Sequence, residues 1–333
     1  MPRRNTGPSQ IRRATLRDVA QAAGVSVWTV SNTFSNPDRV AEATRQRVLE
    51  AADALDFAGP NPGARSLALG RTQTICLTTG DGEARLLLAD PAAALVAEGL
   101  LTACDRAGFS LLLSGRPDGQ IADGVVYFRG VAPGEQAPRG PVVVVDGDAL
   151  EGVPRVTADV RGAAAAMAAH LFDLGHRRIA VLGHPEAGER LLGVADGWNG
   201  PQPIPVYGVG PSPRRGWPDR ADGEAAARTA LAVDPRTTAL LALTDVLAHG
   251  ALDAVHRLGL RAPHDVSVAG IDDLPGSDAV GLTTALVPYR SLGVLAGDLL
   301  IGRLAGAPLP DAPELPTALS LRRSTGPPHP RGV

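Results

Sequence analysis

The N-terminal region carries apolar side chains at the spacing of helices. In the first such segment the apolar positions are Leu16, Val19, Ala20 and Ala23. Intervals of three and four residues predict an amphipathic helix, and Gly24 ends it because glycine adopts a left-handed backbone without a steric penalty. Ser26 is a favourable N-cap, and a second helix is predicted over residues 27–34 with Val30 and Phe34 in the core.

The side chains in the first turns of the second predicted helix are expected on the surface, where they can contact another molecule. Its expected surface residues are Val27, Trp28, Thr29, Ser31 and Asn32. A third amphipathic helix is predicted over residues 42–56. Two short helices joined by a glycine turn are typical of the helix-turn-helix motif, in which the second helix reads base edges in the major groove of DNA. The alternative is a small helical hairpin that only packs.

From residue 72 onward, short apolar runs alternate with helical segments. The predicted strands lie at residues 74–81, 109–114, 122–128, 140–146, 177–183, 238–245 and 266–273. The predicted helices lie at residues 91–108, 161–174, 221–232 and 246–258. Repeated strand–helix units indicate an α/β fold of parallel sheets with helices on both faces. Ligands of such sheets bind beyond the carboxyl ends of the strands, where the loops carry Asp81, Asp146, Asp245, Asp272 and Asp273.

The length and composition of the chain fit a multidomain globular protein. Its 333 residues suit two or three domains, and 44% of them are hydrophobic and 20% charged. No apolar run reaches the roughly 18 residues of a membrane span, and the basic N-terminus is not followed by a signal-peptide core. We therefore expect a cytoplasmic protein without membrane contact. Cys76 and Cys104 stand in apolar surroundings and are expected to be core thiols.

Charge is distributed unevenly along the chain. Residues 1–71 hold ten arginines and six acidic residues, a net charge of +4, so the whole-chain charge of −3 leaves −7 for the remainder. A basic N-terminal part on an acidic body is expected when only one end meets DNA phosphates. The predicted organisation is a disordered basic arm at 1–14, a headpiece at 15–58, a hinge or linker at 59–71, a sensor at 72–324 and a tail at 325–333.

The headpiece sequence shows a specific family resemblance. The strings TLRDVAQAAGVSVWTVS and TRQRVLEAADALDF resemble the headpiece of the lactose-repressor-like (LacI/GalR) transcription factors. The later strings HLFDLGHRRIAVLG, HDVSVAGIDD and LTTALVPYRSLGVLAGDLL resemble the two-lobed periplasmic sugar-binding-protein fold that this family uses as its sensor. The resemblance covers residues 14–324. It implies an N-terminal all-α helix-turn-helix headpiece, a hinge helix, and a two-lobed α/β sensor with parallel sheets.

The resemblance also assigns residues to DNA contacts. The implied base-reading residues are Val27, Trp28 and Asn32. The implied contacts to the DNA backbone are Thr15, Ser26, Thr29, Ser31 and Thr44. In the hinge helix, the implied minor-groove contacts are Asn61, Ala64, Arg65 and Leu67. Leu67 would act as the apolar wedge that opens a base step. The alternative for the last set is a plain interdomain linker.

For the sensor, the resemblance implies a small-molecule site between the lobes, with a sugar as the effector. Its expected residues are Asp81, Asp159, Arg190, Asp245 and Tyr289. Arginine and carboxylate groups that face each other across a cleft can satisfy sugar hydroxyls. Each aspartate has a structural alternative as a helix cap or strand end, and Asp272 and Asp273 are expected to end a strand. Two segments depart from the family pattern, the short link at 115–122 and the Pro- and Gly-rich loop at 198–217.

These features predict a homodimeric transcriptional regulator, with repression as its expected action. It would bind double-stranded DNA at a pseudo-palindromic operator and respond to its effector. No metal is expected, because His170, His176 and His184 lack a carboxylate at ligand spacing. No cofactor or enzymatic activity is expected, because the sequence has no nucleophile elbow, P-loop or GxGxxG motif. Two alternatives stay open, a small-molecule-binding protein with no DNA role and a DNA-binding head fused to an enzyme.

Overall fold

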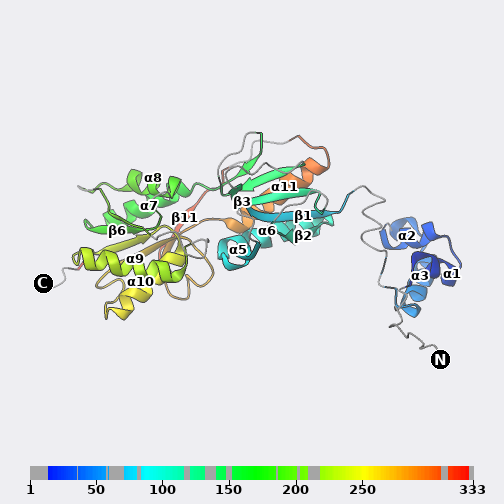
Figure 1. The fold of residues 1–333 in the computed structure, drawn as a ribbon, viewed down its shortest axis with the longest axis horizontal. Coiled ribbons are helices and arrows are strands. Elements are labelled where there is room, and N and C mark those ends of the chain that lie inside the picture. The colour runs from blue at the N-terminus through cyan, green and yellow to red at the C-terminus, as the bar shows by residue number, and fades with distance from the viewer. Residues whose placement is uncertain are drawn as a thin grey trace, which may run out of the picture. The chain divides into compact units, whose positions relative to one another are not determined.

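The computed structural model describes residues 14–35, 37–57, 59, 71–80, 84–115, 121–131, 140–147, 152–184, 187–200, 203–208, 218–308 and 314–329. Its backbone divides into two compact units, Met1–Thr72 and Gln73–Val333 (Figure 1). Several predictions fall outside the described residues, namely the basic arm up to residue 13 and the site residues Asn61, Ala64, Arg65, Leu67 and Asp81. Among the residues that are described, none of the helices has the length and apolarity to cross a membrane.

The headpiece consists of three α-helices and a short 3₁₀ turn. These are α1 (Leu16–Ala23), α2 (Val27–Ser35), η1 (Pro37–Arg39) and α3 (Glu42–Ala54). Thr15 and Asp18 form a reciprocal capping box at the start of α1, and Gly24 ends the helix with a φ of 66°. The core draws on all three helices and contains Val19, Ala20, Val30, Val48 and Ala52. The three predicted helices are confirmed, with α3 ending at Ala54 rather than at Asp56.

The first lobe of the sensor is built on a five-stranded parallel sheet. Its elements are β1 (Thr74–Gly80), α5 (Ala84–Ala89), α6 (Pro91–Ala107), β2 (Ser110–Leu113), β3 (Gly124–Val131), β4 (Val142–Val145), β5 (Arg155–Val156) and, from later in the chain, α11 (Tyr289–Leu304). The strand order is β2-β1-β3-β4-β5. Glycine lets α6 and α11 pack closely, because a Cβ on Gly99 would lie 2.1 Å from the carbonyl oxygen of Arg290.

The two faces of this sheet are covered differently. On one face, Leu77 and Phe128 pack with residues of α6 and α11. On the other, Cys76, Tyr127 and Val144 belong to a separate buried cluster that receives no helix residue within the described part of the chain. The expectation of helices on both faces is not met there, because only residues 114–123 connect β2 to β3. Both cysteines are free and buried, which confirms them as core thiols.

The second lobe is a six-stranded sheet with helices on both faces. Its elements are α7 (Val160–Asp173), β6 (Ile179–Leu182), α8 (Gly188–Gly197), β7 (Val206–Tyr207), α9 (Arg220–Val233), β8 (Ala239–Ala242), α10 (Asp245–Arg257), β9 (Ser267–Asp272), β10 (Thr283–Leu286) and β11 (Ala318–Ser320). The strand order is β11-β10-β9-β8-β6-β7, with β11 antiparallel to β10 and the other pairs parallel. Helices α7 and α8 cover one face, and α9 and α10 cover the other (Figure 1).

Every strand and helix predicted from residue 72 onward is present in the structure. Because neighbouring strands run parallel, their carboxyl ends share one edge of each sheet, and side chains from several loops meet there. The chain returns to the first lobe with α11, so the loop that precedes this helix connects the two lobes. The residues at these strand ends form the candidate effector site.

Candidate functional site

The first turn of α2 presents two large apolar side chains to solvent. Trp28 is 66% exposed and Val27 is 41% exposed. Ser26 precedes the helix, and its Oγ accepts a hydrogen bond from the backbone N–H of Thr29 at 3.0 Å. The hydroxyls of Ser26 and Thr29 lie 2.8 Å apart. These two polar side chains are therefore engaged locally, while the exposed surface beside them is apolar and aromatic.

Asn32 does not have the surface position that the sequence predicts. Its side chain is 7% exposed, and its Nδ2 donates to the backbone carbonyl of Trp28 at 3.1 Å. The amide folds back onto the preceding turn of the same helix, a local bond that Asn side chains readily form. The expected surface exposure of Asn32 is therefore not found, because its amide supports the turn that carries Trp28. Its role in reading bases stays a prediction.

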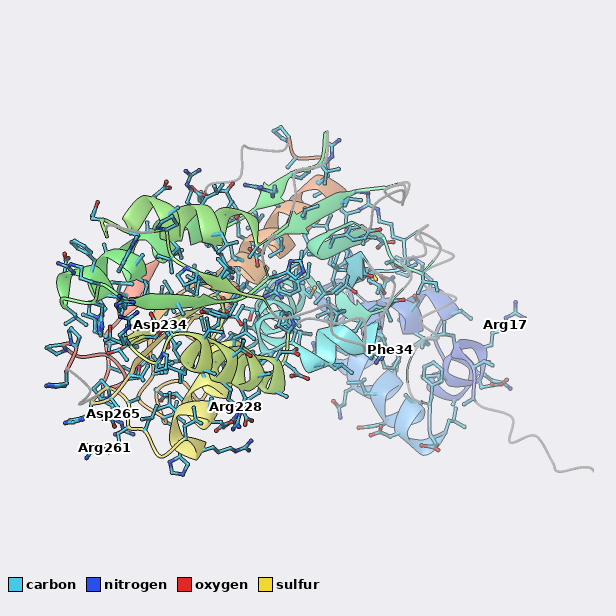
Figure 2. The ribbon with its side chains drawn as sticks, turned by 60° about the vertical axis from the view of Figure 1, so that its left-hand side comes forward. Arg17, Phe34, Arg228, Asp234, Arg261 and Asp265 are labelled. Carbon is cyan, nitrogen blue, oxygen red and sulfur yellow. The ribbon has the colours of Figure 1, made fainter. Side chains whose placement is uncertain are left out.

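The remaining residues predicted to contact the DNA backbone differ in exposure. Thr15 is exposed, and its hydroxyl donates to Asp18 at 2.7 Å within the capping box. Ser31 and Thr44 are half-buried. The exposed arginines of the described headpiece are Arg17, Arg39 and Arg47. Figure 2 shows the side chain of Arg17 pointing outward from α1. Exposed arginines of this kind can contact phosphate.

An arginine, a carboxylate and a phenol form a closed triangle at the carboxyl edge of the second-lobe sheet. Arg190, in the first turn of α8, pairs with Asp272 at the end of β9 at 2.9 Å. The Arg190 guanidinium also donates to the hydroxyl of Tyr289 at 2.8 Å, and that hydroxyl donates to Oδ1 of Asp272 at 2.8 Å. Because Tyr289 begins α11, which packs on the first lobe, the triangle connects the two lobes.

The first lobe contributes a second arginine to the same region. Arg129, near the end of β3, pairs with Asp90 at 2.8 Å and with Asp146 at 3.5 Å. Its guanidinium lies 4.8 Å from the ring centre of Phe128, and the Phe128 ring meets that of Tyr289 edge-on with centroids 6.3 Å apart. The two groups thus form one interlobe cluster, whose members are Asp90, Arg129, Asp146, Arg190, Asp272 and Tyr289.

Burial and mutual charge shift pKa values throughout the interlobe cluster. Burial raises the pKa of Asp272 to about 6, although Arg190 opposes the shift. Burial also raises the pKa of Tyr289, so the phenol stays neutral and can donate. Burial works against the charge of Arg129 and Arg190, but the neighbouring carboxylates raise the pKa of both guanidinium groups. The cluster therefore holds two fixed cations and a carboxylate that titrates near pH 6.

Several residues at this strand edge adopt a left-handed backbone although they are not glycine. The φ angle is 64° at Arg129, 49° at Asp146, 137° at Asp272 and 54° at Asp273. The pairing of β3 with β1 is also irregular close to Arg129. Such conformations cost on the order of 1–3 kcal/mol each, and they concentrate at ligand-binding and active sites. The residues with left-handed backbone therefore lie at the same sheet edges as the charged side chains of the cluster.

The predicted effector residues separate in the structure. Arg190 and Tyr289 lie together in the interlobe cluster. Asp159 instead caps α7, where its Oδ1 accepts a hydrogen bond from the backbone N–H of Gly162 at 2.7 Å. This is the structural alternative for Asp159, and the structure does not bring its carboxylate into the interlobe cluster.

Asp245 is also withdrawn from solvent. It is fully buried at the start of α10, where it accepts hydrogen bonds from the hydroxyls of Ser277 and Thr284 and from the backbone N–H of Leu274. Burial raises the pKa of this carboxyl group. A Cβ on Gly270 would lie 2.3 Å from its Oδ1, so the carboxylate is tightly enclosed. The structure thus gives Asp245 the structural role of a strand end, because its oxygens hold the loop after β9. Its role as an effector ligand stays a prediction.

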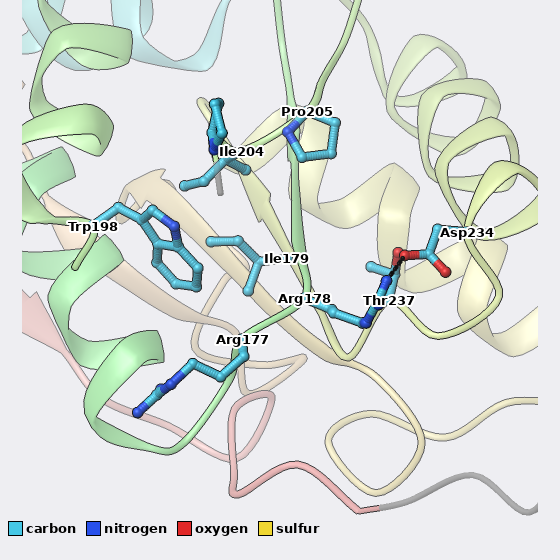
Figure 3. A pocket seen from close by; sticks show the side chains of 9 residues that line it. Arg177, Arg178, Ile179, Trp198, Ile204, Pro205, Asp234 and Thr237 are labelled. Atoms are coloured by element: carbon cyan, nitrogen blue, oxygen red, sulfur yellow. Dashed lines mark hydrogen bonds and ion pairs between the residues drawn. The ribbon is translucent and has the colours of Figure 1, made fainter. Parts of the chain in front are cut away.

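A pocket lies at the opposite, amino end of the second-lobe sheet. Its volume is about 580 Å³, and it is lined by Arg177, Arg178, Ile179, Trp198, Pro203, Ile204, Pro205, Asp234 and Thr237. Figure 3 shows the Trp198 ring turned toward Ile179 and Ile204. Ile179 begins β6, whereas ligands of parallel sheets bind beyond the carboxyl ends of the strands. The interlobe cluster is therefore the stronger candidate for effector binding.

Two of the three histidines considered as metal ligands bond to other protein groups. The Nε2 of His176 donates to the carbonyl of Gly326 at 2.9 Å, and its Nδ1 lies 2.8 Å from the hydroxyl of Thr238. The Nε2 of His170 lies 3.2 Å from the hydroxyl of Thr325. Over the ranges that the structure describes, no three His, Cys, Asp or Glu side chains gather where they could hold a metal ion.

The headpiece and the sensor each match a known family. Residues 15–61 match bacterial regulatory proteins of the lacI family, and residues 168–325 match a periplasmic binding protein-like domain. The HTH-type transcriptional regulator Rv3575c of Mycobacterium tuberculosis is 32% identical over 358 residues, covering 96% of this chain and 99% of that protein. The chain belongs to the lacI family.

Solved structures of lacI-family proteins share both parts of the fold. The lac repressor dimer bound to operator and the anti-inducer ONPF matches with a TM-score of 0.75 and 25% identity, covering 95% of this chain and 100% of that one. The transcriptional regulator CelR in complex with cellobiose matches with a TM-score of 0.64 and 28% identity, covering 94% and 100%. The predicted fold class is confirmed, and this lacI-family chain is a transcriptional regulator of the helix-turn-helix type.

Four members of the interlobe cluster of this lacI-family regulator are not predicted from the sequence. They are Asp90, Arg129, Asp146 and Asp272. Asp146 and Asp272 carry a usable signal, since both stand where predicted strands end and ligands of parallel sheets bind. The sequence signal for Asp90 and Arg129 is weaker. Each residue only borders a predicted helix or strand, and the two partners are 39 positions apart in sequence.

Proposed function

We propose that this lacI-family regulator binds a pseudo-palindromic operator as a homodimer, and that a sugar-class effector bound at the interlobe cluster changes its affinity for that DNA. Repression is the action that we propose for the DNA-bound form. The observation that carries the proposal is the presence, in one chain, of an exposed helix-turn-helix surface and a buried charged cluster contributed by two lobes. The chemistry of each surface fits a ligand of the kind proposed.

The headpiece supports the DNA half of the proposal. Its second helix begins with the exposed side chains of Val27 and Trp28, at the position from which a recognition helix contacts base edges. The described headpiece also exposes Arg17, Arg39 and Arg47, which can neutralise phosphates. Thr15, Ser26, Thr29, Ser31 and Thr44 remain the proposed backbone contacts, and Asn61, Ala64, Arg65 and Leu67 remain the proposed minor-groove contacts.

The interlobe cluster supports the effector half. A polyhydroxylated ligand offers hydroxyls that donate to Asp272 and accept from Arg190, so it can replace the internal bonds of the triangle without leaving a buried charge unpaired. Arg129 and Asp146 offer the same combination from the first lobe. The cellobiose complex of CelR concerns that relative, and it supports a sugar as the class of ligand here.

The two halves are coupled through the geometry of the lobes. The Tyr289 hydroxyl connects α11 to the end of β9, so a ligand that competes for its partners changes how the lobes are held together. A coupling of about 1–3 kcal/mol corresponds to a roughly 5–150-fold change in DNA affinity, the usual range for allosteric effectors. Because the proposed target is bacterial chromosomal DNA, we place the protein in the cytoplasm and assign it no catalytic reaction.

The DNA half is tested with fragments from the region upstream of the regulator's own gene. Purified full-length protein is titrated against these fragments by fluorescence anisotropy in low salt, with unrelated DNA as competitor. We expect a complex that resists the competitor, and sedimentation should show two protein copies bound per fragment. A monomer that shows no preference for any fragment would rule out the DNA half.

The effector half is tested by a thermal-shift screen of sugars, with nucleosides as the comparison set. We expect a sugar to raise the melting temperature, since a ligand that binds only the folded state stabilises it by mass action. The same compound should then change the anisotropy titration. A compound that stabilises the protein without altering DNA affinity would favour the alternative of a binding protein whose ligand has no regulatory effect.

A further inference from the structure

The start of the recognition helix offers an unusual chemistry for reading DNA. Most specific base contacts in the major groove are hydrogen bonds from polar or charged side chains. In this headpiece, polar side chains near the start of α2 form hydrogen bonds within the same segment. Ser26 and Thr29 bond to each other, and the amide of Asn32 donates to the carbonyl of Trp28. The large exposed side chains there are Val27 and Trp28.

Trp28 is not needed to fill the headpiece core. The core contains Val19, Ala20, Val30, Val48 and Ala52, and an edge-on contact between Phe34 and Phe57, with centroids 5.8 Å apart, packs beside it. Trp28 remains 66% exposed. An aromatic ring of this size in water is unfavourable unless a partner covers it, and indole combines an apolar body with a single hydrogen-bond donor.

Thymine is the base whose major-groove edge fits this chemistry. It presents a methyl group on C5 beside the O4 acceptor, whereas guanine presents two acceptors, cytosine a donor, and adenine an acceptor and a donor. The methyl group is the one apolar feature in that groove. Val27 can contact only such a feature, and Trp28 can contact the methyl with its ring and O4 with its indole N–H.

We propose that Val27 and Trp28 recognise a thymine 5-methyl group in each half of the operator, so that base selection by this headpiece rests on apolar contact. The inference rests on the proposed function, since it requires that α2 enters the major groove. Removal of the methyl should therefore weaken binding even when every Watson–Crick and O4 contact is kept. A buried methyl contact of about 0.8 kcal/mol corresponds to about a fourfold loss.

Deoxyuridine supplies the test, because it differs from thymidine only by the missing methyl. In the operator fragment bound by the full-length protein, each thymine is replaced singly by uracil, and the dissociation constant is measured by anisotropy. We expect about a fourfold loss at one or two positions in each half-site and no change elsewhere.

Three variants connect the effect to the residues. In Trp28→Ala or Val27→Ala, the uracil and thymine operators should bind with equal affinity at the sensitive position. Leu49→Ala is the matched control, because Leu49 is an exposed apolar residue of the same headpiece on α3, and it should keep the full difference. Circular dichroism checks that each variant is folded.

The outcomes separate this inference from the proposed function. Specific binding that is insensitive to uracil at every position, or a sensitivity that persists in both the Trp28→Ala and Val27→Ala variants, would overturn methyl recognition and leave the regulator intact. Failure of the unmodified protein to bind any fragment specifically would overturn the proposed function itself.

Discussion

The hydroxyl of Tyr289 donates to Oδ1 of Asp272 at 2.8 Å and accepts from Arg190 at the same distance. Tyr289 begins α11, which packs on the first lobe, and Asp272 ends β9 in the second. This bond therefore joins the lobes through one buried phenol. Its position at the carboxyl strand edge makes it sensitive to any ligand that binds there.

Removing the Tyr289 hydroxyl should destabilise the sensor without leaving a cavity in its core. In Tyr289→Phe the ring can keep its edge-on contact with Phe128, but Asp272 loses a donor. A hydrogen bond to a charged group contributes about 1.5–3 kcal/mol, so we expect the free energy of unfolding to fall by about that amount. Urea unfolding followed by circular dichroism measures it. Tyr207→Phe, on β7 outside the interlobe cluster, is the control, and an equal loss in both variants would contradict the assigned role.

The arginines of the interlobe cluster should control the response to effector more than the affinity for DNA. Lysine keeps the positive charge but lacks the planar fork of donors. In Arg190→Lys and Arg129→Lys, we expect the effector concentration for half-maximal response to rise about tenfold or more, which corresponds to about 1.4 kcal/mol. DNA affinity without effector should stay close to that of the unmodified protein.

Arg177→Lys supplies the matched control for these variants. Arg177 borders the pocket at the amino end of the second-lobe sheet, so its substitution should leave the response unchanged if the effector binds at the interlobe cluster. Effector titrations of the anisotropy signal compare the three variants. A response lost in Arg177→Lys and kept in the other two would move the effector site to that pocket.

The headpiece can be predicted closely from sequence because its determinants are local. Thr15 caps α1, Gly24 ends it, and Ser26 begins α2, each through groups within four residues. The burial of Asn32 is different. Its position two residues after the core residue Val30 suggests the outer face of the helix, and only the packed domain shows that its amide turns back to Trp28.

The ion pairs of the interlobe cluster cannot be predicted from the sequence. Parallel strands predict which edge holds the site, and Asp146 and Asp272 both stand there. Which acid joins the interlobe cluster depends on the arginine that reaches it, and Arg129 reaches Asp90 across 39 positions of sequence. Asp245 satisfies the same strand-end rule, yet hydroxyl donors from the loop after β9 and from β10 enclose it. Such pairings are set by tertiary structure rather than by local pattern.

Asn32→Ala should weaken DNA binding without changing which bases are preferred. The substitution removes a buried hydrogen bond to the carbonyl of Trp28, so we expect the headpiece to lose about 1 kcal/mol of stability. Affinity should fall by a similar factor for every single-base variant of the operator, because the helix start is disordered as a whole. Anisotropy titrations of such a variant set measure this. A loss confined to one base position would instead support Asn32 as a base-reading residue.

His176 should make the second lobe sensitive to acid. Burial lowers its pKa from 6.5 to about 4, and the neutral ring bonds to Gly326 and Thr238. Between these two values the unfolded chain binds a proton that the folded chain does not, so stability is complete above about pH 6.5 and falls as the pH drops toward 4. The full shift corresponds to a loss of about 3 kcal/mol.

His176→Gln isolates this contribution, because glutamine does not titrate. The variant should be less stable at neutral pH, where it loses the ring contacts, but its free energy of unfolding should change less between about pH 7 and pH 4.5. Asp272 shifts in the opposite sense, since its raised pKa of about 6 makes the folded state hold a proton that the unfolded state has lost. Its contribution falls as the pH rises from about 4 to 6, equally in both proteins, so the difference between the two urea-unfolding series reports His176 alone. Parallel pH profiles for the two proteins would show that His176 does not set the acid sensitivity.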